Sequence, residues 1–121
     1  RDRYIDLYEF APVAYITLNA GGTINAINMT GALQLGMDRA KLINQRFSTF
    51  VSDTDKDRWY RLFISLMKPG TQQDYPQKTR LTMMRQDHST FDAFLCCIVK
   101  ETSDSPPLLR IALMDMSPNE Q

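Results

Sequence analysis

The chain has 121 residues, of which 43% are hydrophobic and 23% charged, so it can bury the core of one domain and is unlike a disordered segment. Its 14 basic and 14 acidic residues cancel, which argues against nucleic acid as the main partner. No apolar run reaches the roughly 20 residues needed to cross a bilayer. Two cysteines are too few for a disulfide scaffold, and we expect a cytoplasmic protein.

The first part of the chain predicts a short helix followed by a β-hairpin. Residues 1–12 carry apolar side chains at helical spacing, and Pro12 ends the helix because it disfavours helical backbone in the residue before it. The segments 13–19 and 23–28 are rich in β-branched and aromatic residues. The glycine pair between them permits the tight turn of a hairpin.

Two short helices and one longer helix are predicted next. Asn28 and Asp38 are the expected N-caps of the short helices, since their side-chain oxygens can accept backbone hydrogen bonds. Gly36 is expected to close the first of them. The segment Ser52–Lys68 predicts the longer helix, with one apolar stripe made of Trp59, Leu62, Phe63, Leu66 and Met67.

Three strand-like segments complete the chain. Residues 77–86 and 90–101 are joined by a turn at 87–89, and a polar loop over 102–107 leads to the last strand, 108–117. The order of helix, two strands, helices and three strands predicts an α+β fold. We expect one antiparallel sheet with helices on one face.

Several of these stretches together resemble a PAS domain. The opening "YIDLYEFAPVAYITLNAGGTINAIN" has the family's helix, Ala-Pro, strand, glycine turn, strand and Asn. The stretch "LGMDRAKLINQRFSTFVSDTD" is similar to the family's next part, and Asp115–Ser117 resembles its C-terminal Asp-Ile-Thr signature. Two positions depart from the pattern. The turn reads Asp87-His88 where Asp-Gly is usual, and the end signature reads Asp-Met-Ser.

The resemblance implies a five-stranded antiparallel sheet with helices on one face, plus an N-terminal helix. Residues 1–12 would be an N-terminal cap helix, 13–117 the PAS core and 118–121 the start of a linker to an output domain. The implied function is a non-catalytic sensory or dimerisation module of a larger, bacterial-type signalling protein, such as a histidine kinase or a GGDEF/EAL-type regulator. The alternative is a protein–protein interaction module without a ligand.

The resemblance also bears on cofactors. The light-sensing members carry a flavin-reactive cysteine in the connector where this chain has Phe47, and the haem-binding members carry a histidine on the long helix, which has none here. The single histidine, His88, falls in a predicted turn. We therefore expect neither flavin nor haem. The acidic residues 53, 55 and 57 lack the glycine and closing glutamate of a calcium loop, so no metal is expected.

Strand alternation and the helical stripe predict an apolar layer between the sheet and the helices. This layer is either a filled core or a pocket for a small apolar ligand, and the sequence leaves both open. The candidate lining residues are Ile16, Leu18, Leu33, Leu42, Phe47, Phe50, Trp59, Phe63, Leu66, Met83, Leu95, Cys97, Ile111 and Leu113.

The opposite face of the sheet is also predicted to be largely apolar, which requires a cover. Because neighbouring residues of a strand point to opposite faces, Cys97 should face the core and Cys96 the outer face. The N-terminal helix is expected to cover part of the outer face, and a second copy the rest, in a two-fold homodimer. The candidate interface residues are Tyr4, Leu7, Tyr8, Tyr15, Phe94, Cys96, Ile98 and Met114.

Overall fold

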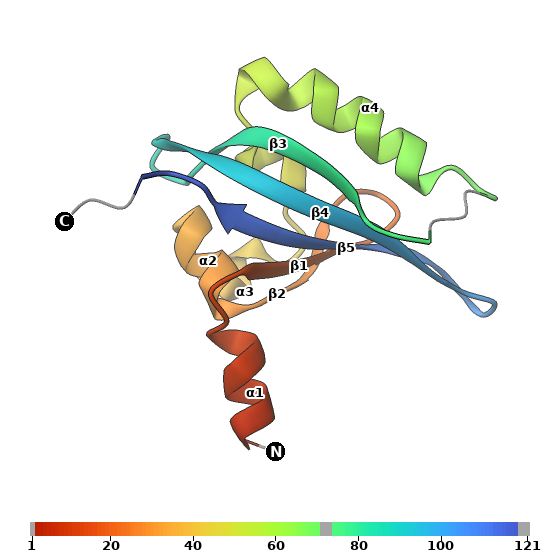
Figure 1. Ribbon diagram of the computed structural model, residues 1–121, viewed down its shortest axis with the longest axis horizontal. Helices are drawn as coiled ribbons and strands as arrows, with labels where there is room; N and C mark the ends of the chain where they lie inside the picture. Colours follow the sequence, from red (N-terminus) through yellow and green to blue (C-terminus); the bar gives the residue numbers. More distant parts are fainter. Residues whose placement is uncertain (1, 71–73, 119–121) are drawn as a thin grey trace.

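The computed structural model describes residues 2–70 and 74–118 and shows a five-stranded sheet with helices packed against it (Figure 1). The helices are α1 (Asp2–Glu9), α2 (Met29–Leu35), α3 (Arg39–Leu42) and α4 (Lys56–Met67), with single 3-10 turns at Phe47–Phe50 and Asp53–Asp55. The strands are β1 (Ala14–Leu18), β2 (Ile24–Ile27), β3 (Gln77–Met84), β4 (Thr90–Thr102) and β5 (Ser105–Asp115).

The sheet has the strand order β2-β1-β5-β4-β3, and every neighbouring pair is antiparallel. The chain forms the β1–β2 hairpin, crosses through the helices to the far edge, and returns through β3, β4 and β5 as a meander. The last strand therefore lies in the centre, between β1 and β4. The α+β prediction of one antiparallel sheet with helices on one face is confirmed.

Alternation along the strands separates a buried face from an outer face. On β4, Phe91, Ala93, Leu95 and Cys97 are at most 3% exposed, whereas the residues between them are half-buried or exposed. The same period-two pattern continues on β5. Burial of the first set against the helices forms the core, as predicted from the sequence.

The caps of α2 are as predicted. Asn28 Oδ1 accepts a hydrogen bond from Gly31 N at 3.0 Å. Gly36 adopts the left-handed conformation, with φ of 75°, and closes the helix. Asp38 stands at the N-cap position of α3, but its side chain makes no capping bond, so that part of the prediction is wrong.

The predicted helix Ser52–Lys68 begins later than expected. Residues 53–55 form a 3-10 turn, and α4 starts at Lys56. The reason is a pair of bonds to the sheet edge: Ser52 N donates to Thr82 O at 2.9 Å, and Asp55 Oδ2 accepts from Thr82 N at 2.7 Å. These tertiary bonds hold the segment against β3.

The predicted loop over 102–107 is also wrong, because β5 begins at Ser105 and only residues 103 and 104 form the turn. Pro106 and Pro107 lie in the strand. They are tolerated there because β5 pairs with β1 only from Leu109 onward, so this stretch lacks a neighbour on that side. Of the predicted linker over 118–121, residues 119–121 lie outside the described residues.

Candidate functional site

The predicted lining residues are buried between the sheet and the helices, with one exception. Leu33 is 70% exposed, so its placement in the layer is wrong. The buried side of α2 is formed by Gly31, Ala32 and Leu35, and position 33 points away from it in a helix of 3.6 residues per turn. The other candidates are each at most 8% exposed: Ile16, Leu18, Leu42, Phe47, Phe50, Trp59, Phe63, Leu66, Met83, Leu95, Cys97, Ile111 and Leu113.

Large aromatic side chains occupy this layer. The ring centroids of Phe47 and Trp59 are 4.9 Å apart, and those of Trp59 and Phe63 are 5.9 Å apart. Such tilted contacts are favourable for aromatic pairs in a close-packed interior. Phe47, at the connector position discussed above, is fully buried in this cluster. The binding of a ligand in this layer stays a prediction.

The outer face of the sheet carries a groove of about 550 Å³. Its lining is mostly apolar and includes four of the predicted interface residues, Tyr8, Tyr15, Cys96 and Ile98. The lining is completed by Ile16, Thr17, Pro76, Arg110, Ile111 and Ala112. We call this hollow the outer groove. It is the candidate functional site because it is an apolar hollow on a face that the chain's own helices leave open.

The remaining predicted interface residues lie near the outer groove or on α1. Phe94 pairs with Met114 across β4 and β5, and both are half-buried on the outer face. Sequence reasoning missed Arg110, the one charged residue of the lining. The signal was available, because position 110 shares its parity on β5 with the outward residues 112 and 114.

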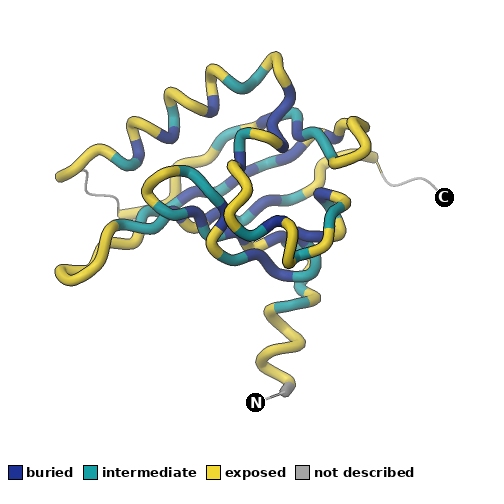
Figure 2. Tube along the Cα trace, turned by 180° about the vertical axis from the view of Figure 1, so that it is seen from behind, coloured by how far each residue is buried: buried dark blue, intermediate teal, exposed yellow. Residues whose placement is uncertain are grey.

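Helix α1 does not cover the outer face in the way the sequence predicted. It projects away from the domain just before the start of β1 and is exposed along most of its length (Figures 1 and 2). Tyr4 is 79% and Leu7 66% exposed, so the predicted cover by these two side chains is wrong. Only Tyr8 contributes, with its ring stacked on Tyr15 at a centroid distance of 6.0 Å and an interplanar angle of 8°.

Partial burial has an electrostatic effect on the Tyr8 phenol. Desolvation, reinforced by the neighbouring Glu9 carboxylate, raises the pKa of Tyr8 above its ordinary value of 10.0, and Arg39 opposes this shift. The phenol is therefore neutral throughout the physiological pH range. In the Tyr8–Tyr15 stack, the Tyr8 ring therefore lines the outer groove without a charge.

The adjacent cysteines point to opposite faces, as predicted. Burial, and to a lesser extent the neighbouring Cys96 thiol, raises the pKa of Cys97 from 9.0 to about 12. Between pH 9 and about 12, the folded chain thus keeps the Cys97 thiol protonated, whereas the unfolded chain loses this proton. This contribution to stability is complete below pH 9 and falls as the pH rises from 9 towards 12.

We expect this difference to appear in thiol labelling. At pH 8.5, iodoacetamide should modify Cys96 and leave Cys97 unmodified in the folded chain, because the reagent needs an accessible thiolate. Both residues should react in urea. Peptide mass spectrometry with fragmentation between the two residues measures this, and labelling of Cys97 in the folded chain would contradict its placement.

Two negative observations apply to the part of the chain that the structure describes. It contains no group of three or more His, Cys, Asp or Glu side chains arranged to hold a metal ion. None of its helices is both long and apolar enough to span a membrane.

Solved structures show which fold this is. A PAS domain of an HTR-like protein from Haloarcula marismortui superposes with a TM-score of 0.77 at 20% identity, over 95% of this chain and 90% of that one. This chain has the PAS fold. A domain of a sensory box sensor histidine kinase/response regulator from Geobacter sulfurreducens matches with a TM-score of 0.70 at 16% identity, covering 92% and 90% of the two chains.

A third match is the PAS domain of a LuxR-family transcriptional regulator from Burkholderia thailandensis, with a TM-score of 0.71 at 16% identity, covering 93% and 96% of the two chains. Neither a family model nor a curated protein matches the sequence. Likeness at these identities establishes the PAS fold of the chain. Function is argued separately below.

Local backbone conformation and hydrogen bonds accommodate the Asp87-His88 turn. His88 adopts φ of 73°, the left-handed conformation that glycine favours at such a position. Asp87 Oδ1 accepts hydrogen bonds from Ser89 N and Ser89 Oγ, and these bonds lower the pKa of Asp87. His88 is exposed on this turn, away from both the aromatic cluster and the outer groove.

Proposed function

We propose that this chain is a non-catalytic sensory and dimerisation module of a larger, cytoplasmic, bacterial-type signal-transduction protein. The PAS fold supports it, together with neighbours that include a sensor histidine kinase and a transcriptional regulator. The observation that carries the proposal is the open, apolar outer groove beside an exposed α1. A catalytic role is disfavoured, since the single histidine of the chain lies exposed on a turn.

The partner proposed for the outer groove is a second copy of this chain. A two-fold contact would pair each copy's groove and α1 with those of the other. Tyr4 and Leu7 on α1 and Tyr15 in the groove are all large apolar side chains left exposed in one copy. Covering them removes apolar surface from water, and this burial drives association.

Transmission is proposed to run through the sheet towards an output domain, of the histidine kinase or GGDEF/EAL type. A shift in the packing of the aromatic layer would displace β4 and β5, whose inward residues contact it and whose outward residues form the outer groove. The end of β5 is held by Arg85, which pairs with Asp115 at 3.7 Å and stacks over Phe91 at 4.5 Å. A ligand acts in this scheme by favouring one packing over another.

The proposed stimulus is a small apolar ligand in the buried layer. The Burkholderia thailandensis neighbour, which was solved in complex with ethanol, supports a small-molecule stimulus. A second candidate function, an interaction module without a ligand, is favoured by the packing of Phe47, Phe50 and Met83, which are at most 2% exposed.

A thermal-shift assay with a panel of small alcohols, fatty acids and aromatic compounds separates the two candidates. We expect at least one compound to raise the Tm by about 5 °C or more at a hundredfold excess over its Kd. A Tm that stays constant across the panel, with self-association intact, would contradict ligand sensing and support the interaction module.

A further inference from the structure

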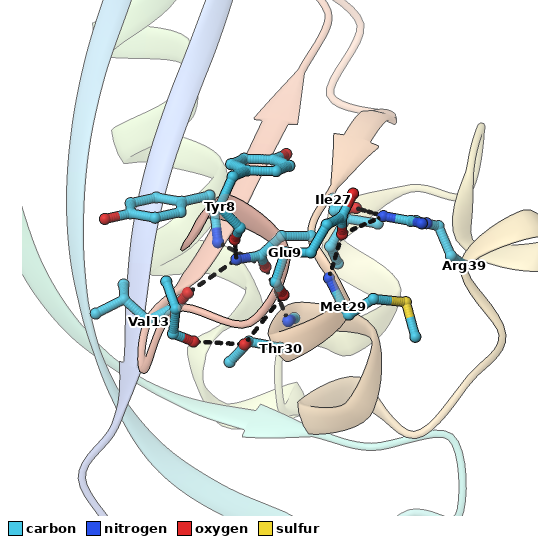
Figure 3. Close-up of polar contacts among 11 residues, drawn as sticks. Tyr8, Glu9, Val13, Ile27, Met29, Thr30 and Arg39 are labelled. Atoms are coloured by element: carbon cyan, nitrogen blue, oxygen red, sulfur yellow. Dashed lines mark hydrogen bonds and ion pairs between the residues drawn. The ribbon is translucent and has the colours of Figure 1, made fainter. Parts of the chain in front are cut away.

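The C-terminal end of α1 is held to the domain by polar side chains (Figure 3). Glu9 Oε1 accepts a hydrogen bond from Met29 N at 3.0 Å, at the first residue of α2. The same oxygen pairs with Arg39 Nη1 on α3. Thr30 Oγ1 of α2 donates to Ala11 O, just after α1. We call Glu9, Asn28, Thr30 and Arg39 the α1 clamp.

Asn28 completes the α1 clamp from a fully buried position. Its Nδ2 donates to Tyr8 O at 2.8 Å and to Val13 O at 3.0 Å. Its Oδ1 accepts from Tyr15 N and Gly31 N, each at 3.0 Å. One side chain thus joins α1, the start of β1 and the first turn of α2.

Residues 3–7 of α1, whose side chains the structure describes, make no such polar bonds to the rest of the domain. Tyr4 and Leu7 are exposed, and the Tyr8–Tyr15 stack is the aromatic contact that the helix makes with the sheet. Polar bonds at one end, rather than apolar burial along its length, therefore set the direction of α1. Because hydrogen bonds depend on angle as well as distance, they fix direction better than a loose apolar contact does.

Helix α2, to which α1 is clamped, is in turn tightly packed on the domain. A Cβ added to Gly31 would lie 2.7 Å from Ile27 Cγ1, so the helix sits directly on β2. Leu35 is 1% exposed, and its carbonyl accepts a hydrogen bond from Gln86 N at 3.0 Å. A change of packing beneath α2 therefore moves the residues that hold α1.

We propose that the α1 clamp makes α1 and α2 one rigid unit, so that a displacement of α2 on the core turns the exposed helix α1. The Glu9–Arg39 pair is the positioning element, because it ties the last residue of α1 to both α2 and α3. The consequence for signalling rests on the proposed function: turning α1 reorients the exposed side chains of Tyr4 and Leu7, which are proposed to meet the second copy. The mechanical coupling itself does not depend on dimerisation.

Spin labels at positions 6 and 65 measure this coupling in the whole chain. Both sites are exposed, Asp6 on α1 and Ser65 on α4. Cys96→Ala removes the reactive native thiol, while buried Cys97 stays unlabelled. Dilution with unlabelled chain restricts double electron–electron resonance to distances within one copy. A monomeric chain therefore serves equally well, and failure of the dimer proposal is distinguishable from failure of this one.

Glu9→Ala and Arg39→Ala are each expected to broaden the 6–65 distance distribution about twofold, because α1 loses its fixed direction. Asp38→Ala is the matched control. Asp38 is an exposed acid next to Arg39 whose side chain makes no capping bond, and the distribution should keep its width. An unchanged width in Glu9→Ala and Arg39→Ala would overturn the proposal.

Gly31→Ala tests whether displacement is transmitted. The added Cβ forces α2 away from Ile27, and we expect the mean 6–65 distance to shift. In the Glu9→Ala background the shift should shrink, because only the Asn28 and Thr30 bonds of the α1 clamp remain. An equal shift with and without Glu9 would contradict coupling through the α1 clamp. If Gly31→Ala does not fold, the width measurements alone decide the proposal.

Discussion

Replacing Asn28 with alanine is expected to lower the free energy of unfolding by about 3–4 kcal/mol. The loss of an N-cap alone costs about 1 kcal/mol. The change also leaves Tyr15 N, Tyr8 O and Val13 O without the partner they have in the folded chain. A fully buried unsatisfied group costs about 1–3 kcal/mol, and these three part-buried groups should together add about 2–3 kcal/mol, since water can reach them in part. Such a loss is a large share of the about 5–15 kcal/mol that stabilises a domain.

Asn25→Ala is the matched control for this prediction. Asn25 lies three residues before Asn28, on β2, and is exposed. Surface substitutions of this kind change stability by about 0.5 kcal/mol or less. Urea denaturation followed by circular dichroism measures both variants. A loss below 1 kcal/mol for Asn28→Ala would mean that water or a relaxed backbone replaces the bonds that the side chain makes.

The second large effect is expected on self-association. Ile98→Asp should raise the dimer Kd by about tenfold or more, because the contact loses an apolar side chain and must desolvate a carboxylate, which Arg110 on the facing strand compensates only in part. Ile98 is half-buried in one copy and lines the outer groove, so the folded monomer can keep the charge in water. The Tm extrapolated to low concentration should therefore change little.

Thr102→Asp is the matched control, because it adds the same charge to β4 at a position outside the outer groove. Thr102 lies on the same strand at the exposed β4–β5 turn, outside the lining of the outer groove. It should leave the dimer Kd within about threefold of the unsubstituted chain, as expected for a rim or distant charge. Analytical ultracentrifugation over a concentration series gives both constants. Equal effects of the two substitutions would place the interface elsewhere.

Local patterns in the sequence were sufficient for most of the fold. The alternation of "TFDAFLCC" distinguished the two faces of β4, because a strand places successive side chains on opposite sides. Asn28 and Gly36 marked the ends of α2, since capping depends on the residue type and its immediate neighbours. The paired cysteines were correctly separated by the same rule.

Features that depend on tertiary contacts were not predictable in this way. The start of α4 moved because Asp55 and Ser52 bond to Thr82, which is 27 residues further along the chain from Asp55. Leu33 was predicted to be a core residue, but α2 packs on the sheet through Gly31, Ala32 and Leu35 and leaves Leu33 exposed. The proposed direction of α1 depends on Glu9 and Arg39, which are 30 residues apart. Nothing in their residue types or neighbours predicts that these two side chains pair.

The candidate site was predicted in part. Alternation identified Tyr15, Cys96 and Ile98 as outward, and the structure places them around one hollow. It did not show that α1 leaves this face open, since helical periodicity says which residues share a stripe and not where the helix points. The part of the apolar face that α1 was predicted to cover is thus also left available to a partner.

Static light scattering of the unsubstituted chain between about 1 and 100 µM tests the central proposal most directly, because stable homodimers form in this range or below it. The account predicts a molar mass approaching twice the 13.9 kDa of one chain. It also predicts that the Ile98→Asp variant has the molar mass of a single chain. A mass of 13.9 kDa across the whole range, unchanged by that substitution, would contradict a dimerisation module built on the outer groove.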